Sequence, residues 1–173
     1  MPVGNLEFIK SASGTSVSLI DITDCFSSKY DVYAVTLEVF DGGFLKGARL
    51  RFLDSGGTVI DQSEYDYAAL NLLSSTAFSE SKATNTTFIT GVGGAEASPN
   101  GSGGIFYIYN PYDSSSYTFA TIQTSSRVNT GAISGSGVKG IGVHKSAEQL
   151  SGIRIYASSG TFGEMSVSVY GVK

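Results

Sequence analysis

The sequence contains few side chains that could carry out acid–base chemistry. His144 is its only histidine, and catalysis needs several groups with matched proton affinities held together. Its neighbours Val143 and Lys145 are typical of the surface end of a strand, so we expect a structural His144. An enzyme would require His144 to lie in a pocket against a carboxylate. We therefore predict that the protein is not an enzyme and has no catalytic residues.

Nucleophile, phosphate and metal motifs are also lacking. The single cysteine, Cys25, cannot form an intramolecular disulfide and cannot by itself build a zinc site. It lies in an apolar stretch, and we interpret it as a small core residue. The sequence has no G-x-S-x-G elbow, no H-E-x-x-H and no P-loop. We therefore expect no cofactor and no metal ligand set.

Two groups of acidic residues are compatible with a calcium site. One group is Asp21 with Asp24, and the other is Asp61, Glu64 and Asp66. Oxygen ligands on a loop could collect calcium, but the spacing of an EF-hand is absent. We favour ordinary solvated carboxylates.

Tyrosines are concentrated between Ile105 and Tyr117. Tyrosine joins a large apolar face to a hydroxyl group, which suits protein interfaces and sugar stacking. We favour a core role, with Tyr107 and Tyr109 filling the core and the other two closing its end. A protein interface and a sugar site remain open for all four: Tyr107, Tyr109, Tyr112 and Tyr117.

The elements that must position these residues are β-strands. Apolar and polar residues alternate with the period of two that is typical of strands buried on one face. With turn signals between the runs, the total is about ten strands, as in a sandwich or barrel. The runs are Leu6–Ile9, Ser16–Ile22, Tyr33–Phe40, Ala48–Asp54, Thr58–Gln62, Thr86–Thr90, Ile105–Tyr109, Tyr117–Thr124, Gly140–His144, Gly152–Tyr156 and Met165–Tyr170.

Helix and long loops occupy the remainder. Only Tyr65–Leu73 has the pattern of a helical turn or two, and no strong cap precedes it. The glycine-rich segments Gly91–Gly104 and Ser125–Gly137 are predicted to be long surface loops. The fold class we expect is all-β: one antiparallel, jelly-roll-like sandwich domain over residues 1–173 with little helix.

Composition excludes several partners. Charged residues make up 15% of the 173 residues, the net charge is −4 and the pI is about 4.9. Nucleic-acid affinity comes mainly from clustered lysine and arginine, so we expect no nucleic-acid partner. No apolar run is long enough to span a membrane, and the N-terminal residues lack the pattern of a secretory signal. We expect a protein made and used without export by that route.

Three stretches of the sequence form a recognisable pattern. They are Phe26–Ala68, the Asn-Pro strand pair Tyr107–Phe119, and the closing hairpin Ser151–Lys173 with its Tyr-Gly-aliphatic-Lys end. Together they resemble small virion structural proteins of tailed bacteriophages. The resemblance covers about half of the chain, and its C-terminal signature is the most distinctive part. The resemblance implies a jelly-roll-like sandwich on heads or tails.

These observations together predict a non-enzymatic virion protein, assembled in the host cytoplasm. The leading expectation is a capsid decoration or cement protein on the outer head surface, a homotrimer seated on the major capsid protein. The alternative is a tail fibre or receptor-binding module that holds a host glycan. Exposure of Tyr109 and Tyr112 in a concave groove would favour the glycan.

Overall fold

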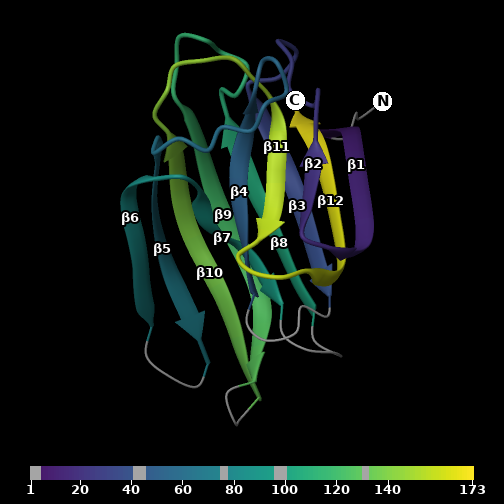
Figure 1. Ribbon diagram of the computed structural model, residues 1–173, viewed down its shortest axis with the longest axis vertical. Helices are drawn as coiled ribbons and strands as arrows, with labels where there is room; N and C mark the ends of the chain where they lie inside the picture. The colour runs from purple at the N-terminus through teal and green to yellow at the C-terminus, as the bar shows by residue number, and fades with distance from the viewer. Residues whose placement is uncertain (1–4, 41–45, 75–77, 96–100, 130–132) are drawn as a thin grey trace.

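The computed structural model describes residues 5–40, 46–74, 78–95, 101–129 and 133–173 (Figure 1). Within these residues the chain forms twelve strands and no helix. No helix in this part could therefore cross a membrane. The strands are β1 (Leu6–Val17), β2 (Leu19–Ile22), β3 (Val32–Phe40), β4 (Lys46–Asp54), β5 (Tyr65–Leu73), β6 (Ser79–Thr86), β7 (Ile89–Ala95), β8 (Gly101–Tyr109), β9 (Thr118–Asn129), β10 (Ile133–His144), β11 (Leu150–Ala157) and β12 (Phe162–Val172).

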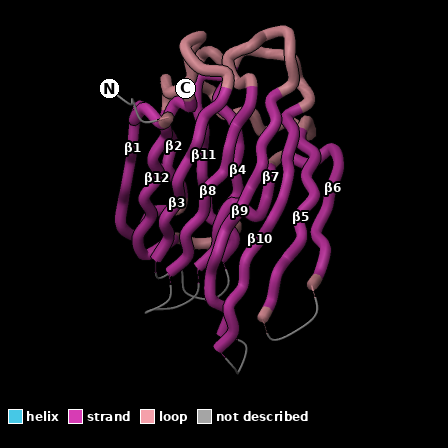
Figure 2. The backbone as a smooth tube through the Cα atoms, turned by 180° about the vertical axis from the view of Figure 1, so that it is seen from behind, coloured by secondary structure: helices cyan, strands magenta, loops and turns pink. Residues whose placement is uncertain are grey.

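The strands form two antiparallel sheets. The large sheet has eight strands in the order β1-β12-β3-β8-β9-β10-β5-β6, and the small sheet has four in the order β2-β11-β4-β7. Figure 2 shows the strands of the large sheet side by side from β1 to β6. Each strand of the small sheet lies in sequence between two strands of the large sheet. This crossing between layers confirms the predicted antiparallel, jelly-roll-like sandwich.

The core lies between the sheets and follows the predicted alternation. On β3, the side chains of Tyr33, Val35, Leu37 and Val39 are all buried, while Glu38 is exposed. The alternating buried side chains of the neighbouring strand β12 point to the same side, and those of β11 point at them from the facing sheet. Cys25 is buried in the same core, as predicted, and burial raises the pKa of its thiol to about 12. The thiol therefore stays protonated and unreactive.

Two buried tyrosines connect the core to the chain between strands. The Tyr33 hydroxyl accepts a hydrogen bond from the Ser27 amide and donates one to the Ser27 carbonyl. The Tyr65 hydroxyl accepts one from the Phe52 amide and donates one to the Ile60 carbonyl. A buried hydroxyl without partners would be costly. These tyrosines therefore fix the backbone before β3 and after β4.

Two predicted elements were wrong, and a third is shorter than predicted. Tyr65–Leu73 is strand β5 and not helix, because Tyr65 and Ala69 are buried while Ala68 and Leu70 are exposed. The predicted hairpin of Ser151–Lys173 does not form, since β11 pairs with β2 and β4 whereas β12 pairs with β1 and β3.

The predicted strand Thr58–Gln62 is reduced to an antiparallel bridge, Leu53 to Val59. Backbone hydrogen bonds flank the bridge, from the Asp54 amide to the Thr58 carbonyl and from the Ile60 amide to the Phe52 carbonyl.

The two predicted glycine-rich loops are mostly strand. Residues 91–95 belong to β7, 101–104 to β8, 125–129 to β9 and 133–137 to β10. Glycine lowers strand propensity, but here the ladder supplies partners to the backbone, as in the pairs Gly103–Ser125 and Ser126–Ser136. Residues 96–100 and 130–132 lie outside the described residues.

A glycine on β10 allows the small sheet to approach the large one. A Cβ added at Gly142 would lie 2.6, 2.8 and 2.9 Å from three side-chain carbons of Ile89 on β7. Ile89 is fully buried, and its branched side chain has few rotamers into which it could move. Gly142 therefore sets the spacing of the layers beneath β10.

We predict that Gly142→Ala lowers the free energy of unfolding by about 1–3 kcal/mol, the usual cost of an overpacked core. The control is Gly47→Ala, because the nearest atom to its added Cβ is Ser158 Oγ at 4.0 Å. Urea titration of the three proteins measures both changes. Equal stability of Gly142→Ala and the original protein would contradict the prediction.

Candidate functional site

The large sheet has an outer face, which points away from the small sheet, and this face is apolar along one band. Strand pairing places eight residues in a line across all eight strands, and we call this line the aromatic row. Its members, from β1 to β6, are Phe8, Tyr170, Ala34, Tyr107, Thr121, Ile141, Ala68 and Lys82. The rings of Phe8 and Tyr170 meet edge to face with their centroids 5.7 Å apart.

A second row runs beside the aromatic row. It contains Val32, Tyr109, Phe119, Val143 and Asp66 on β3, β8, β9, β10 and β5. Phe119 is 46% exposed and Ile141, in the aromatic row, is 60% exposed. Two neighbouring, mostly apolar rows thus present several exposed side chains to solvent in the isolated chain, whereas Ala34 is covered.

The outer face becomes polar away from these two rows. The next row on the other side of the aromatic row is mainly polar and includes Thr36, Gln123 and Lys139. Beyond it the pairs join Ser166 with Glu38 and Ser125 with Gly137. The apolar band therefore lies toward the end of the sheet that carries the Asn110-Pro111 turn.

The tyrosine cluster is divided between this face and the rim of the core. On β8, Phe106 and Ile108 are fully buried, so the alternating Tyr107 and Tyr109 point to the outer face. The prediction that Tyr107 and Tyr109 fill the core was wrong. The Tyr109 hydroxyl lies 3.3 Å from Thr121 Oγ1 on the neighbouring strand.

The other two tyrosines lie around the β8–β9 connection. Tyr112 is partly buried and packs against the core, whereas Tyr117 is 47% exposed. The predicted strand pair around Asn110-Pro111 is confirmed, since Tyr109 pairs with Phe119. Sequence periodicity places Tyr107 and Tyr109 on one face but does not say which face is covered.

A groove of about 730 Å³ crosses the outer face over β9, β10, β5 and β6. Ala68, Ile141 and Val143 form its middle, between Phe119 and Thr121 on one side and β6 on the other. Its charged lining residues are Asp66 and Lys82, and Asp66 is already paired with Lys145 at 2.8 Å. The full lining is Asp66, Tyr67, Ala68, Lys82, Ala83, Thr84, Phe119, Ala120, Thr121, Ile141, Gly142 and Val143.

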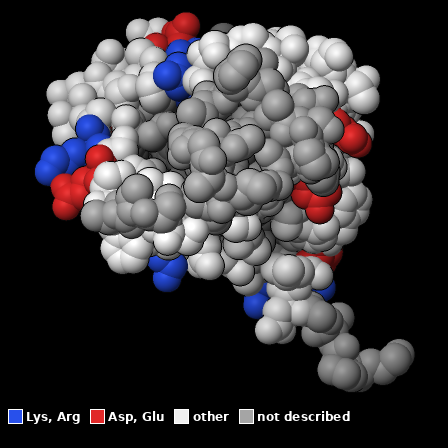
Figure 3. Space-filling view, turned by 90° about the horizontal axis from the view of Figure 1, so that it is seen from below, with Lys and Arg blue, Asp and Glu red and all other residues white. Residues whose placement is uncertain are grey.

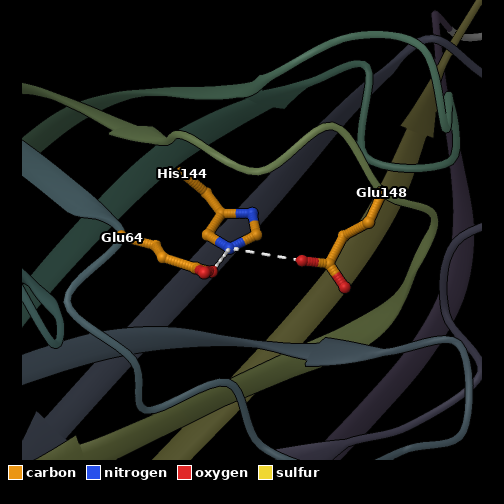
Figure 4. A group of neighbouring side chains, drawn as sticks. All are labelled: Glu64, His144 and Glu148. Atoms are coloured by element: carbon orange, nitrogen blue, oxygen red, sulfur yellow. Dashed lines mark hydrogen bonds and ion pairs between the residues drawn. The ribbon is translucent and has the colours of Figure 1, made fainter.

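A second cluster joins His144 to two carboxylates (Figure 4). His144 Nε2 lies 3.2 Å from Glu64 Oε2 and 3.7 Å from Glu148 Oε1. His144 is the last residue of β10 and pairs with Tyr65, which places Glu64 beside it. Glu148 comes from the segment between β10 and β11. The backbone bond from the Lys145 amide to the Glu64 carbonyl, 2.8 Å, fixes the two segments.

His144 lies at a strand end, as predicted, but it is fully buried and not at the surface. Its ring contacts the rings of Phe52 and Tyr65, with centroids 5.9 and 5.0 Å away. Burial lowers the pKa of His144 below the ordinary value of 6.5, although the two carboxylates act in the opposite direction. The neutral imidazole has one N–H, and the geometry assigns it to Nε2, donating to Glu64.

Catalysis by His144 would require both a neighbouring carboxylate and a position in a pocket, and His144 meets only the first requirement. A carboxylate is within hydrogen-bonding distance, but none of the three residues lines the groove described above. His144 points to the core side of β10, whereas the groove lies on the outer face. The cluster is therefore not placed to act on a molecule held in the groove.

Two of the acidic residues considered for calcium, one from each group, are paired with basic side chains. Asp21 forms two bonds of 2.7 Å with Arg154, and Asp66 pairs with Lys145. Among the described residues, the one set of three acidic, histidine or cysteine side chains close enough to share an ion is Glu64, His144 and Glu148. The sequence gives no sign of this set, because Glu64 and His144 are eighty positions apart. No short motif connects them.

Comparison with known proteins identifies no family for this chain. Neither protein-family models nor curated proteins match the sequence. Among solved structures, exo-inulinase from Aspergillus awamori aligns with a TM-score of 0.42 at 6% identity over 96% of this chain, which spans 29% of that chain. A single mutant of congerin II aligns with a TM-score of 0.32 at 10% identity, over 92% of this chain and 99% of that one.

We predict that His144 titrates below pH 6.5 in the folded protein. Because the pKa of His144 is lower in the folded state than in the unfolded state, the unfolded chain binds the proton first as the pH falls. The contribution to stability is therefore complete above about pH 6.5 and declines as the pH falls through the folded pKa. Because the chain has one histidine, the imidazole signals in an NMR titration can be assigned directly to His144. EDTA in the sample keeps metal ions away from the ring. A pKa above 6.5 would contradict the prediction.

Proposed function

We propose that the chain is a non-enzymatic structural protein of a bacteriophage particle, and that the outer face of its large sheet is a permanent contact between copies. The observation that carries this proposal is the aromatic row with its neighbouring row, left uncovered in the single chain. Contiguous apolar surface of this kind is rare on monomers and usually marks an interaction site.

The size of the band favours a protein partner. Seven strand spacings of 4.7–4.9 Å give a row about 33 Å long. An interface between folded proteins has a comparable extent, covering about 800 Å² of each partner. A bound sugar would cover only part of this length.

The chemistry of the band favours a permanent contact. Phe8, Tyr107, Phe119 and Ile141 supply apolar area. The two rows have two charged members, Lys82 and Asp66, which lie at their β6 and β5 ends. Interfaces that never open are more apolar than transient ones. Tyrosine and phenylalanine are also enriched in protein interfaces.

The virion setting comes from the sequence resemblance. We propose a capsid decoration protein, a homotrimer seated on the major capsid protein at the outer head surface. Edge strands β1 and β6 end the large sheet, and exposed edges invite unwanted pairing. Seen from below, the charged side chains of the described residues are scattered over this face and form no broad patch of one sign (Figure 3).

We predict that the original protein sediments as a trimer in analytical ultracentrifugation and that the double variant Phe119→Glu, Ile141→Glu sediments as a monomer. Both side chains are exposed in the single chain, so the fold should tolerate the change, whereas burying two carboxylates in an apolar contact is costly. Circular dichroism checks that the variant is folded.

The matched control is Gln123→Glu, an exposed position on β9 outside the two apolar rows. It should remain a trimer. A monomeric original protein would refute the proposal, and so would a double variant that assembles like the control.

The groove supports a second candidate, a receptor-binding module that holds a host glycan. Its volume of about 730 Å³ is within the usual range of small-ligand sites. Phe119 offers a ring, and Lys82 and Thr121 offer polar groups beside it. Aromatic stacking with flanking hydrogen bonds is how proteins bind sugars.

For this candidate we predict saturable binding of an oligosaccharide from a panel derived from bacterial envelopes, measured by calorimetry. Phe119→Ala should abolish the binding, while Tyr117→Ala, an exposed tyrosine outside the groove lining, should retain it. If no oligosaccharide of the panel binds and the trimer covers Phe119, the glycan candidate is refuted and only the structural proposal remains.

A further inference from the structure

We propose that Glu64, His144 and Glu148 bind a first-row transition metal ion, with Zn²⁺ as the probe. The three residues come from the segment before β5, the end of β10 and the segment before β11. Their ligand atoms lie within 4.8 Å of one another. This site is separate from the outer face and adds a property that the proposed function does not require.

The distances suit a small coordination shell. Zinc bonds of about 2.0–2.1 Å in tetrahedral geometry place neighbouring ligand atoms about 3.3 Å apart. His144 Nε2 is 3.2 Å from Glu64 Oε2 and 3.7 Å from Glu148 Oε1. Small rotations of the two partly exposed glutamates bring all three atoms to one ion.

The charge balance at the cluster also favours a cation. Two carboxylates converge on one imidazole, whose single outward N–H can serve only one of them when His144 is neutral. In the described part of the chain, neither Glu64 nor Glu148 forms an ion pair with a lysine or arginine. By contrast, Asp21, Asp66 and Glu7 each have a basic partner. An ion at Nε2 would neutralise both carboxylates at once.

The fixed imidazole selects the kind of ion. His144 is fully buried and held between the rings of Phe52 and Tyr65, so its Nε2 cannot turn away from the carboxylates. Imidazole nitrogen suits zinc and its neighbours, whereas calcium and magnesium prefer sets of oxygen ligands. Glu64 and Glu148 are 39% and 34% exposed, which leaves the fourth position open to solvent.

A bound ion would join the two sheets at this end of the sandwich. His144 belongs to the large sheet, and Glu148 lies just before β11 of the small sheet. Binding only to the folded chain would raise its stability in proportion to the logarithm of the metal concentration above Kd. We therefore expect the bound ion to stabilise the folded chain.

The test is calorimetric titration of the full chain with Zn²⁺ at neutral pH. The chain carries no tag, and it is treated with EDTA and then freed of it by dialysis before the titration. We expect one ion per chain, a raised melting temperature and a shift of the His144 Nε2 signal in ¹⁵N NMR. Because the chain has a single histidine, that shift reports coordination at this site alone.

Glu64→Gln and Glu148→Gln should each weaken Zn²⁺ binding by about tenfold or more, because each removes a charged ligand. Glu80→Gln on β6 is the matched control: it makes the same chemical change at an exposed residue outside the cluster and should bind like the original protein. No binding heat with an unmoved His144 signal would overturn the proposal. Equal binding by the two cluster variants and the control would also overturn it.

Discussion

Successive residues of a strand point to opposite faces of its sheet, so the eight-stranded sheet has two faces to cover. The four strands of the small sheet cover one of them and enclose the core. On the other face of the large sheet, strands β8, β9 and β10 carry Tyr107, Phe119 and Ile141 toward solvent. The cost of exposing this apolar band is the constraint from which the proposed assembly follows.

Strand β10 shows how closely the two faces are coupled. Ile141 lies in the middle of the groove, Gly142 admits Ile89 from the small sheet, and His144 ends the strand beside two carboxylates. These three residues lie within one short stretch of the strand, yet they serve the outer face, the layer spacing and the ion cluster. A shift of one residue in the pairing of β10 would disrupt all three.

Sequence periodicity predicted the fold class and most strands because alternation directly reports one-sided burial, as on β3 and β12. It failed for β5, where the run Tyr65–Leu73 contains small and long apolar residues that suit either helix or strand. It also failed at the glycine-rich ends of β7 to β10, where pairing with neighbouring strands overrides the low propensity of glycine. Propensity is local, whereas ladder bonds join distant segments.

The candidate sites were less predictable for the same reason. Alternation placed Tyr107 and Tyr109 on one face, but only the arrangement of the sheets reveals that Phe106 and Ile108 take the core. The cluster at His144 depends on the pairing of β10 with β5, which brings Glu64 beside a residue eighty positions later. No spacing within the sequence encodes that contact.

Electron cryo-microscopy of the assembled particle tests the central claim most directly, because it reveals what lies against the outer face of the large sheet. The account predicts that density from a neighbouring copy covers Phe119 and Ile141 and excludes solvent from the aromatic row. A particle in which these two side chains face open solvent, with the copies joined elsewhere, would contradict it.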